Sequence, residues 1–144
     1  MEGLAEQLIA TYLTRGGKVF IAPQYSIPAS GGNGDWACPD FVALDFENRE
    51  IIVVEVTVAS NVSNILSKIN DRQSRWFEPV RAKLSEDKIV ENDWKIRVLV
   101  FVRKSQLEKA RKQLSGEPDV SFYAIEDATF DWDYWTDRHG GLPR

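Results

Sequence analysis

Residues 39–57, PDFVALDFENREIIVVEVT, place two runs of strand-forming residues on either side of a short polar stretch. β-Branched and aromatic side chains dominate both runs, and Asn48 and Arg49 favour a turn between them. The stretch therefore predicts a β-hairpin, which defines two neighbouring strands of the fold. Asp40 and Glu55 lie near the outer ends of these strands, at positions where the apolar pattern favours core residues.

The register of this hairpin decides which side chains share a face. The simplest alignment closes a loop over 47–50 and gives three cross-strand pairs: Phe46 with Ile51, Val42 with Glu55, and Asp40 with Thr57. Opposed residues share a face and the side-chain period is two, so Asp40, Glu55 and Thr57 should project to one side, continuing an apolar face. A shift of one residue would separate the two acids.

Helix and strand signals alternate along the rest of the chain. The pattern predicts helices over 2–15, from Asn61 or Ser63 to Leu84 with a kink or break at Pro79, and over 104–116. It predicts a loop over 28–39 and strands over 18–27, with a bulge or edge position at Pro23, over 94–103 and over 120–126. This order predicts an α/β fold: a three-layer sandwich with a mixed central sheet.

Composition bounds the domain and its chemistry. A chain of 144 residues with 43% hydrophobic residues suits one domain, 1–144, with a core of about residues 2–103 and an extension over 104–144. The formal net charge of −4 argues against coating nucleic acid through bulk charge, so any polyanion site should be local. One cysteine and one histidine exclude an internal disulfide and paired-histidine chemistry. The lack of a basic leader and of a long apolar run predicts no membrane segment and a cytoplasmic location.

The two hairpin acids raise the question of a metal ion. Neighbouring carboxylates beside apolar side chains repel each other and lose hydration, which raises their pKa values or requires a cation. A hard divalent ion such as Mg²⁺ or Mn²⁺ suits two acids, a backbone carbonyl and waters as ligands. The alternative is that one acid only faces water at a strand end. The shared face and the preceding glycine-rich loop favour a metal site at Asp40 and Glu55.

The residues PD, a spacer of 14 residues and then EVT resemble the PD-(D/E)xK nuclease superfamily, whose signature is an acid, a spacer and acid-x-lysine on a β-hairpin. The predicted order of elements up to about residue 103 is similar to the αβββαβ core of this restriction-endonuclease-like fold, which leaves a C-terminal helix-strand extension. The resemblance implies metal binding by Asp40, Glu55 and the carbonyl of Val56. It also implies that Glu6 resembles an extra helix acid of some members, although a solvated helix acid is an equal alternative.

Thr57 departs from the superfamily pattern because it stands where lysine is usual. Threonine lacks the positive charge that would orient and acidify a nucleophilic water, which puts activity in question. Some relatives supply this lysine from the following helix, which makes Lys68 the candidate replacement; the alternative is that Lys68 only extends from the apolar stripe to water. Gln73 falls inside that stripe, where an amide needs a hydrogen-bond partner, so we expect it to face the site.

The same helix carries the basic residues of an acidic chain. Lys68, Arg72 and Arg75 recur at i, i+4 and i+7 on one flank. Such a flank is commonly a solvated face, but beside paired acids it can contact phosphates, so Arg72 and Arg75 are candidates for nucleic-acid binding.

The sequence therefore favours a Mg²⁺- or Mn²⁺-dependent nuclease, an endonuclease or exonuclease that hydrolyses phosphodiester bonds of DNA, with RNA left open. The alternative is a catalytically inactive module of the nuclease fold that binds nucleic acid or a protein. Since many enzymes of that fold dimerise, a homodimer is one expectation. A third hypothesis is a protein partner bound through residues 129–136 of the acidic, aromatic tail; otherwise Phe130, Trp132 and Trp135 should pack onto the domain or a sister subunit.

Overall fold

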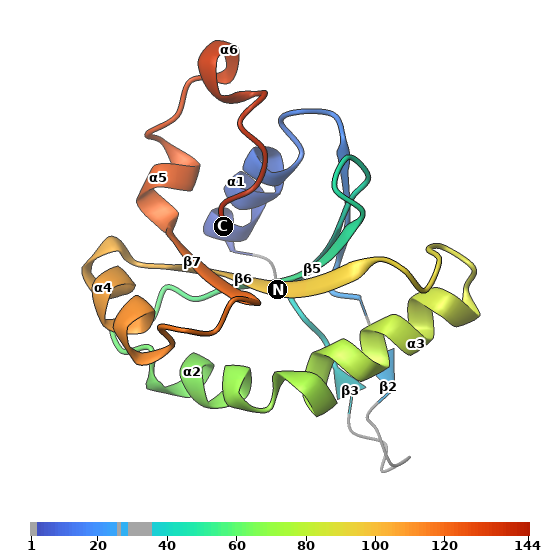
Figure 1. The fold of residues 1–144 in the computed structure, drawn as a ribbon. Coiled ribbons are helices and arrows are strands. Elements are labelled where there is room, and N and C mark those ends of the chain that lie inside the picture. Colours follow the sequence, from blue (N-terminus) through green and yellow to red (C-terminus); the bar gives the residue numbers. More distant parts are fainter. Residues whose placement is uncertain (1–2, 26, 29–35) are drawn as a thin grey trace.

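The computed structural model describes residues 3–25, 27–28 and 36–144, and a five-stranded mixed sheet runs through its centre (Figure 1). The sheet order is β1 (Val19–Pro23), β4 (Phe41–Asp45), β5 (Glu50–Val56), β6 (Lys95–Val102) and β7 (Val120–Ala124). β1, β4 and β5 pair antiparallel, whereas β5, β6 and β7 are parallel. A separate two-stranded sheet pairs β2 (Ile27–Pro28) with β3 (Trp36–Ala37).

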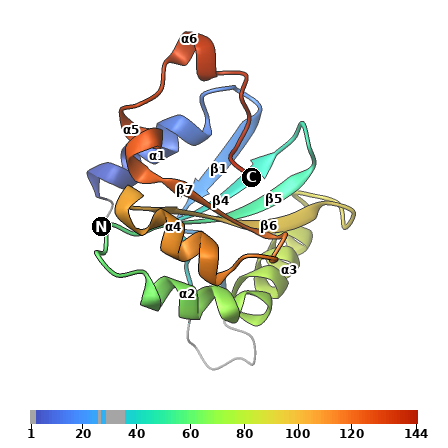
Figure 2. The same cartoon turned by 60° about the vertical axis from the view of Figure 1, so that its left-hand side comes forward.

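Helices cover both faces of the large sheet (Figures 1 and 2). One face packs against α2 (Ser63–Asn70), the π-helical turn η1 (Gln73–Phe77), α3 (Glu78–Glu86) and α4 (Lys104–Gln113), and the other against α1 (Leu4–Leu13) and α5 (Ile125–Thr129). A short helix, α6 (Tyr134–Asp137), lies in the C-terminal tail. The expected α/β class and mixed sheet are confirmed, and the layers are compatible with a three-layer sandwich. No helix in the described part of the chain has the length and apolar character that a bilayer span requires.

Most predicted elements are present with shorter bounds. The helix predicted over 2–15 is α1, and the strand predicted over 94–103 is β6. The strand predicted over 18–27 ends as β1 at Pro23, on the edge of the sheet, as proline's missing N–H favours. The loop predicted over 28–39 contains β3, and its residues 29–35 lie outside the described residues, as does Glu2.

The predicted hairpin is β4 and β5, but its register is shifted by two residues. Phe41 pairs with Val54 and Asp45 with Glu50, so the loop covers 46–49 rather than 47–50. The loop begins early because the Asp45 carboxylate accepts the backbone N–H groups of residues 47 and 48, and it closes at Arg49, whose φ is 55°. A shift of two residues leaves every side chain on its expected face.

The predicted long helix is interrupted before Pro79. α2 ends at Asn70, η1 follows, and Pro79 lies in the first turn of α3, where a missing N–H removes no helical hydrogen bond. At the start of α2, the Asn61 side-chain oxygen accepts the backbone N–H of Ser63 at 2.9 Å. The N-cap position is nevertheless occupied by Val62, without a side-chain cap, so the predicted caps at Asn61 and Ser63 were each displaced by one residue.

The tail crosses the α1 face of the sheet before returning to the hairpin turn. Trp132 packs edge-on against Tyr12, with ring centroids 5.6 Å apart, and Leu142 is buried in the same cluster. Phe130 and Trp135 are instead 77% and 75% exposed. The expected packing onto the domain is thus confirmed for Trp132 and wrong within this chain for the other two, because the backbone of α5 and α6 turns them outward.

Candidate functional site

Asp40 and Glu55 lie opposite each other at the outer end of the hairpin. Asp40 precedes β4 by one residue, and continuing the β4–β5 register sets it directly across from Glu55. The backbone N–H of Asp40 donates to Glu55 Oε2 at 3.1 Å, and the backbone N–H of Val56 donates to Asp40 Oδ2 at 2.8 Å. Each carboxylate is therefore held by an amide of the opposite strand, which brings the two acids closer together than the predicted register did.

Burial and mutual repulsion perturb this acid pair. Glu55 is only 9% exposed, and its desolvation, followed by the charge and hydrogen bonding of Asp40, raises its pKa to about 8. Without a further cation, the pair therefore retains a proton at neutral pH. A cation that displaced this proton would relieve the same repulsion.

Lys68 supplies a positive charge to this site. α2 packs on the sheet through Ile65, Leu66 and Ile69, which leaves Lys68 on its exposed flank. Asp40 lies two residues before Val42, and Glu55 lies two residues after Val53. Residues two apart in a strand share a face, and the side chains of both valines belong to the core on the α2 side. The charge of Lys68 acts to lower the pKa of Glu55, against the larger effect of burial.

Thr57 and Val56 follow Glu55 at the end of β5. The backbone N–H of Thr57 donates to the carbonyl of Phe101 on β6 at 2.9 Å, and its hydroxyl accepts the N–H of Ala59 at 3.3 Å. Thr57 thus organises the start of the loop to α2. The predicted ligand role of the Val56 carbonyl stays a prediction.

Glu6 is half-buried on α1, which covers the opposite face of the sheet from α2. Within residues 3–25, 27–28 and 36–144, no three acidic, histidine or cysteine side chains form a group that could hold a metal ion. A metal at Asp40 and Glu55 would therefore need backbone and water oxygens for its remaining ligands, and a contribution from Glu6 stays a prediction.

Two residues predicted to face the site or its substrate are engaged differently. Gln73 is exposed, because the wider turn of η1 changes the phase of the helix and rotates this residue out of the apolar stripe. Arg72 donates from Nε to Asp119 at 2.6 Å and from Nη2 to Glu117 at 2.9 Å. These contacts raise the pKa of Arg72, and its positive charge is neutralised by acids of the same chain. Arg75 is exposed and has no ion pair in the described part of the chain, so it stays a candidate for phosphate contact.

A second acid pair, which the sequence analysis missed, lies at the turn end of the same hairpin. Asp45 and Glu50 are cross-strand partners and are 3% and 6% exposed. Side chains of other residues bind both acids: Asn48 donates to Asp45 at 2.8 Å, and Arg144 donates to both oxygens of Glu50. Arg97 lies 3.5 Å from Glu50 as well. The spacing of acids at 40, 45, 50 and 55 is the sequence signal for both pairs.

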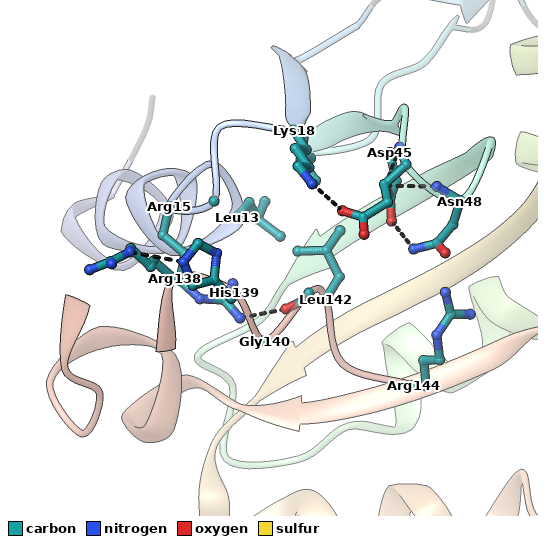
Figure 3. A pocket seen from close by; sticks show the side chains of 14 residues that line it. Leu13, Arg15, Lys18, Asp45, Asn48, Arg138, His139, Gly140, Leu142 and Arg144 are labelled. Atoms are coloured by element: carbon teal, nitrogen blue, oxygen red, sulfur yellow. Dashed lines mark hydrogen bonds and ion pairs between the residues drawn. The ribbon is translucent and has the colours of Figure 1, made fainter. Parts of the chain in front are cut away.

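A cavity of about 340 Å³ lies beside this turn, at the other end of the hairpin from Asp40 and Glu55 (Figure 3). The C-terminal end of α1, the hairpin turn, residues 138–142 and Arg144 line it. Its cations already have partners: Lys18 pairs with Glu47 at 3.2 Å, Arg144 with Glu50, and Arg15 donates to backbone carbonyls of the tail. The cavity therefore does not extend the site at Asp40 and Glu55.

No protein-family model matches this sequence, and the sequence matches no curated protein. The chemistry of the site must therefore be argued from its own geometry. Two opposed, partly desolvated carboxylates with a lysine charge nearby can hold a hard cation, exchange a proton near neutral pH, or do both.

Proposed function

We propose that the protein is a metal-dependent nuclease that hydrolyses phosphodiester bonds of DNA. The observation that carries the proposal is the acid pair: Asp40 and Glu55 are opposed at the outer end of the β4–β5 hairpin, Glu55 is buried, and the exposed Lys68 is a cation that lowers its pKa. Among the described residues no ion pair neutralises Asp40 or Glu55, so the pair is poorly suited to a purely structural role, because it destabilises the fold unless a proton or a cation is bound.

The donor set fits Mg²⁺ or Mn²⁺. Mg²⁺ is commonly bound in enzymes by one or two carboxylates, with waters and substrate phosphates completing the shell. Asp40 and Glu55 would supply these carboxylates, and the carbonyl of Val56 would be a third ligand. Bound there, the ion would acidify a water and polarise a phosphoryl oxygen.

Lys68 would carry out the task of the lysine that Thr57 replaces. Its flexible side chain starts on the exposed flank of α2, and its charge already reaches Glu55. From there it can orient a water or stabilise negative charge that develops on the phosphate. Arg75 lies two turns further along this helical layer and would hold a neighbouring phosphate, whereas Arg72 would not.

The fold supports the same interpretation at a coarser level. A mixed sheet with helices on both faces, and an antiparallel hairpin that carries an acid near the outer end of each strand, is what a restriction-endonuclease-like core requires. We include that core, the superfamily and a homodimeric assembly in the proposal.

Cleavage assays on single-stranded, double-stranded and branched DNA, and on RNA, test the proposal in Mg²⁺ and in Mn²⁺. We expect Asp40→Asn and Glu55→Gln each to abolish metal-dependent cleavage, and Lys68→Ala to slow it by about a hundredfold or more. Glu108→Gln removes an exposed acid of α4 and is the matched control. Cleavage that survived both acid substitutions would show that these residues are not the active site.

A catalytically inactive module of the same fold is the second candidate. Thr57 lacks the charge of the motif lysine, and the backbone amides of Asp40 and Val56 already hold the acid pair. Calorimetry separates the alternatives: Mn²⁺ binding that Asp40→Asn abolishes, together with cleavage, supports the nuclease. Binding of nucleic acid without metal binding or cleavage supports the inactive module.

A further inference from the structure

Three aromatic side chains of the tail are exposed together although the backbone that carries them is ordered. Phe130 follows α5, and Tyr134 and Trp135 begin α6; they are 77%, 49% and 75% exposed. Large aromatic side chains gathered in one exposed segment commonly mark an interaction site. We call residues 126–137 the acidic aromatic surface.

Specific hydrogen bonds hold this surface in one conformation. Asp133 accepts the backbone N–H of Trp135 at 2.8 Å and so caps α6, and Asp137 accepts the backbone N–H of Asp133 at 2.7 Å. Arg15, which follows the C-terminal end of α1, donates to the carbonyl of Asp137 at 2.9 Å. Trp132 packs against Tyr12 and so holds the segment on the domain. A surface that is already ordered loses little conformational entropy when a partner binds.

The charge of this surface identifies the chemistry of its partner. No lysine or arginine occurs from residue 116 to residue 137, whereas five acids lie within the acidic aromatic surface: Glu126, Asp127, Asp131, Asp133 and Asp137. Only Asp127 pairs with a cation in the described part of the chain, at 3.2 Å from Lys104. The negative charge repels nucleic-acid phosphates and attracts lysine and arginine side chains.

The rings themselves also accept cations. The Arg138 guanidinium lies 4.9 Å from the centroid of Trp135 and 5.7 Å from that of Tyr134. Cation–π attraction of this kind stabilises an arginine guanidinium that lies above the face of a tryptophan or tyrosine ring. With Trp135 three-quarters exposed, ring surface remains for an incoming side chain.

We propose that the acidic aromatic surface binds a lysine- and arginine-rich segment of a partner protein. The cationic side chains of the partner stack on Phe130 and Trp135 and pair with Asp131, while the aliphatic parts of those side chains cover the exposed rings. This interaction is independent of the Asp40–Glu55 site, which lies on the α2 side of the sheet.

Fluorescence anisotropy with a labelled peptide of alternating arginine and glycine tests the proposal on the full chain. We expect saturable binding that weakens as salt is added, because exposed charges are screened. Trp135→Ala should weaken binding by about tenfold or more, and Asp131→Asn by about two- to fivefold. Both side chains are exposed, so neither substitution should unfold the protein.

Two control variants separate this surface from the general acidity of the chain. Phe20→Ala removes an aromatic ring that is 64% exposed on β1, and Glu108→Gln removes an exposed acid on α4; both should leave affinity unchanged. Equal affinity of all four variants and the unsubstituted protein would overturn the proposal. Preferential binding of labelled oligothymidine at this surface, or a self-association in sedimentation that Trp135→Ala abolishes, would assign the surface to nucleic acid or to a second copy and would equally overturn it.

Discussion

Glu55→Gln should change stability little at mildly acidic pH and stabilise the protein at mildly alkaline pH. Glu55 is buried beside Asp40, and its pKa is raised from an ordinary 4.5 to about 8 in the folded protein. A glutamine has the shape of the protonated acid, can still accept the backbone N–H of Asp40, and can donate to the Asp40 carboxylate. The substitution therefore replaces a group that must titrate by one that cannot.

The sign and size follow from proton linkage. Because the folded protein holds a proton that the unfolded chain releases, the contribution of Glu55 to the free energy of unfolding is fully present below about pH 4.5. It is lost as pH rises through about 8. The slope is about 1.4 kcal/mol per pH unit, so roughly 4 kcal/mol is lost between about pH 5 and about pH 8. The glutamine variant lacks this loss and should be the more stable protein at the alkaline end.

Urea unfolding of both proteins in a metal-free buffer, at several pH values across this interval, measures the effect. The decisive quantity is the difference between the two free energies of unfolding, since titrating groups that do not interact with Glu55 cancel in it. For Glu108→Gln, which replaces an exposed acid, the difference in free energy of unfolding from the unsubstituted protein should not change with pH. If the difference for Glu55→Gln were also constant, then Glu55 would not be a desolvated acid coupled to Asp40, and the electrostatic argument for the site would fail.

Three further outcomes follow from described contacts. Mg²⁺ at about a hundred times its dissociation constant should raise the free energy of unfolding by about 2.7 kcal/mol, and Asp40→Asn should abolish this gain in the same urea experiment. Arg72→Ala should lower stability by about 1 to 3 kcal/mol, because it leaves Asp119 without its cation, but should leave DNA affinity in a gel-shift assay unchanged. Gly16→Ala should lower the melting temperature more than Gly3→Ala does, because its Cβ would lie 2.6 Å from the carbonyl oxygen of Arg138, whereas nothing lies within 4 Å at Gly3.

The sequence predicted those elements whose pattern has one explanation. β5 and β6 lie in the middle of the sheet with both faces covered, so their nearly continuous apolar runs indicate strands without ambiguity. The shared face of Val42, Ile51 and Val53 was also predicted correctly. Hydrophobic alternation specifies a face but not a pairing partner, and pairings that differ by two residues share the same faces. The choice between them depended on the Asp45 carboxylate, which captures two amides of the turn.

The errors arose where tertiary contacts or an irregular helix decide the outcome. Gln73 was expected inside the apolar stripe because a regular helical period was extended through a segment that forms a π-helical turn. Arg72 was a candidate for phosphate contact, with a solvated face as the alternative, and local spacing could not reveal its ion pairs with Glu117 and Asp119, which precede β7 more than forty residues later in the chain. Trp135 is exposed although its hydrophobicity favours burial, and neither α5 nor α6 offers it an apolar partner in the sheet layers.

The two acid pairs of the hairpin show why its function could not be derived from spacing alone. One register sets Asp40 across from Glu55 and Asp45 across from Glu50. The local sequence pattern therefore does not distinguish which of the two pairs is functional. Within the described residues, arginines form ion pairs with Glu50 of the turn pair but with neither Asp40 nor Glu55, and these arginines come from β6 and from the end of the tail. The arginines neutralise Glu50 of the turn pair, whereas no ion pair among the described residues neutralises Asp40 or Glu55, which is why we propose the latter pair as the metal site. The tertiary contacts of Glu50, which the local sequence pattern does not reveal, are therefore the reason that we propose Glu55 rather than Glu50 as a metal ligand.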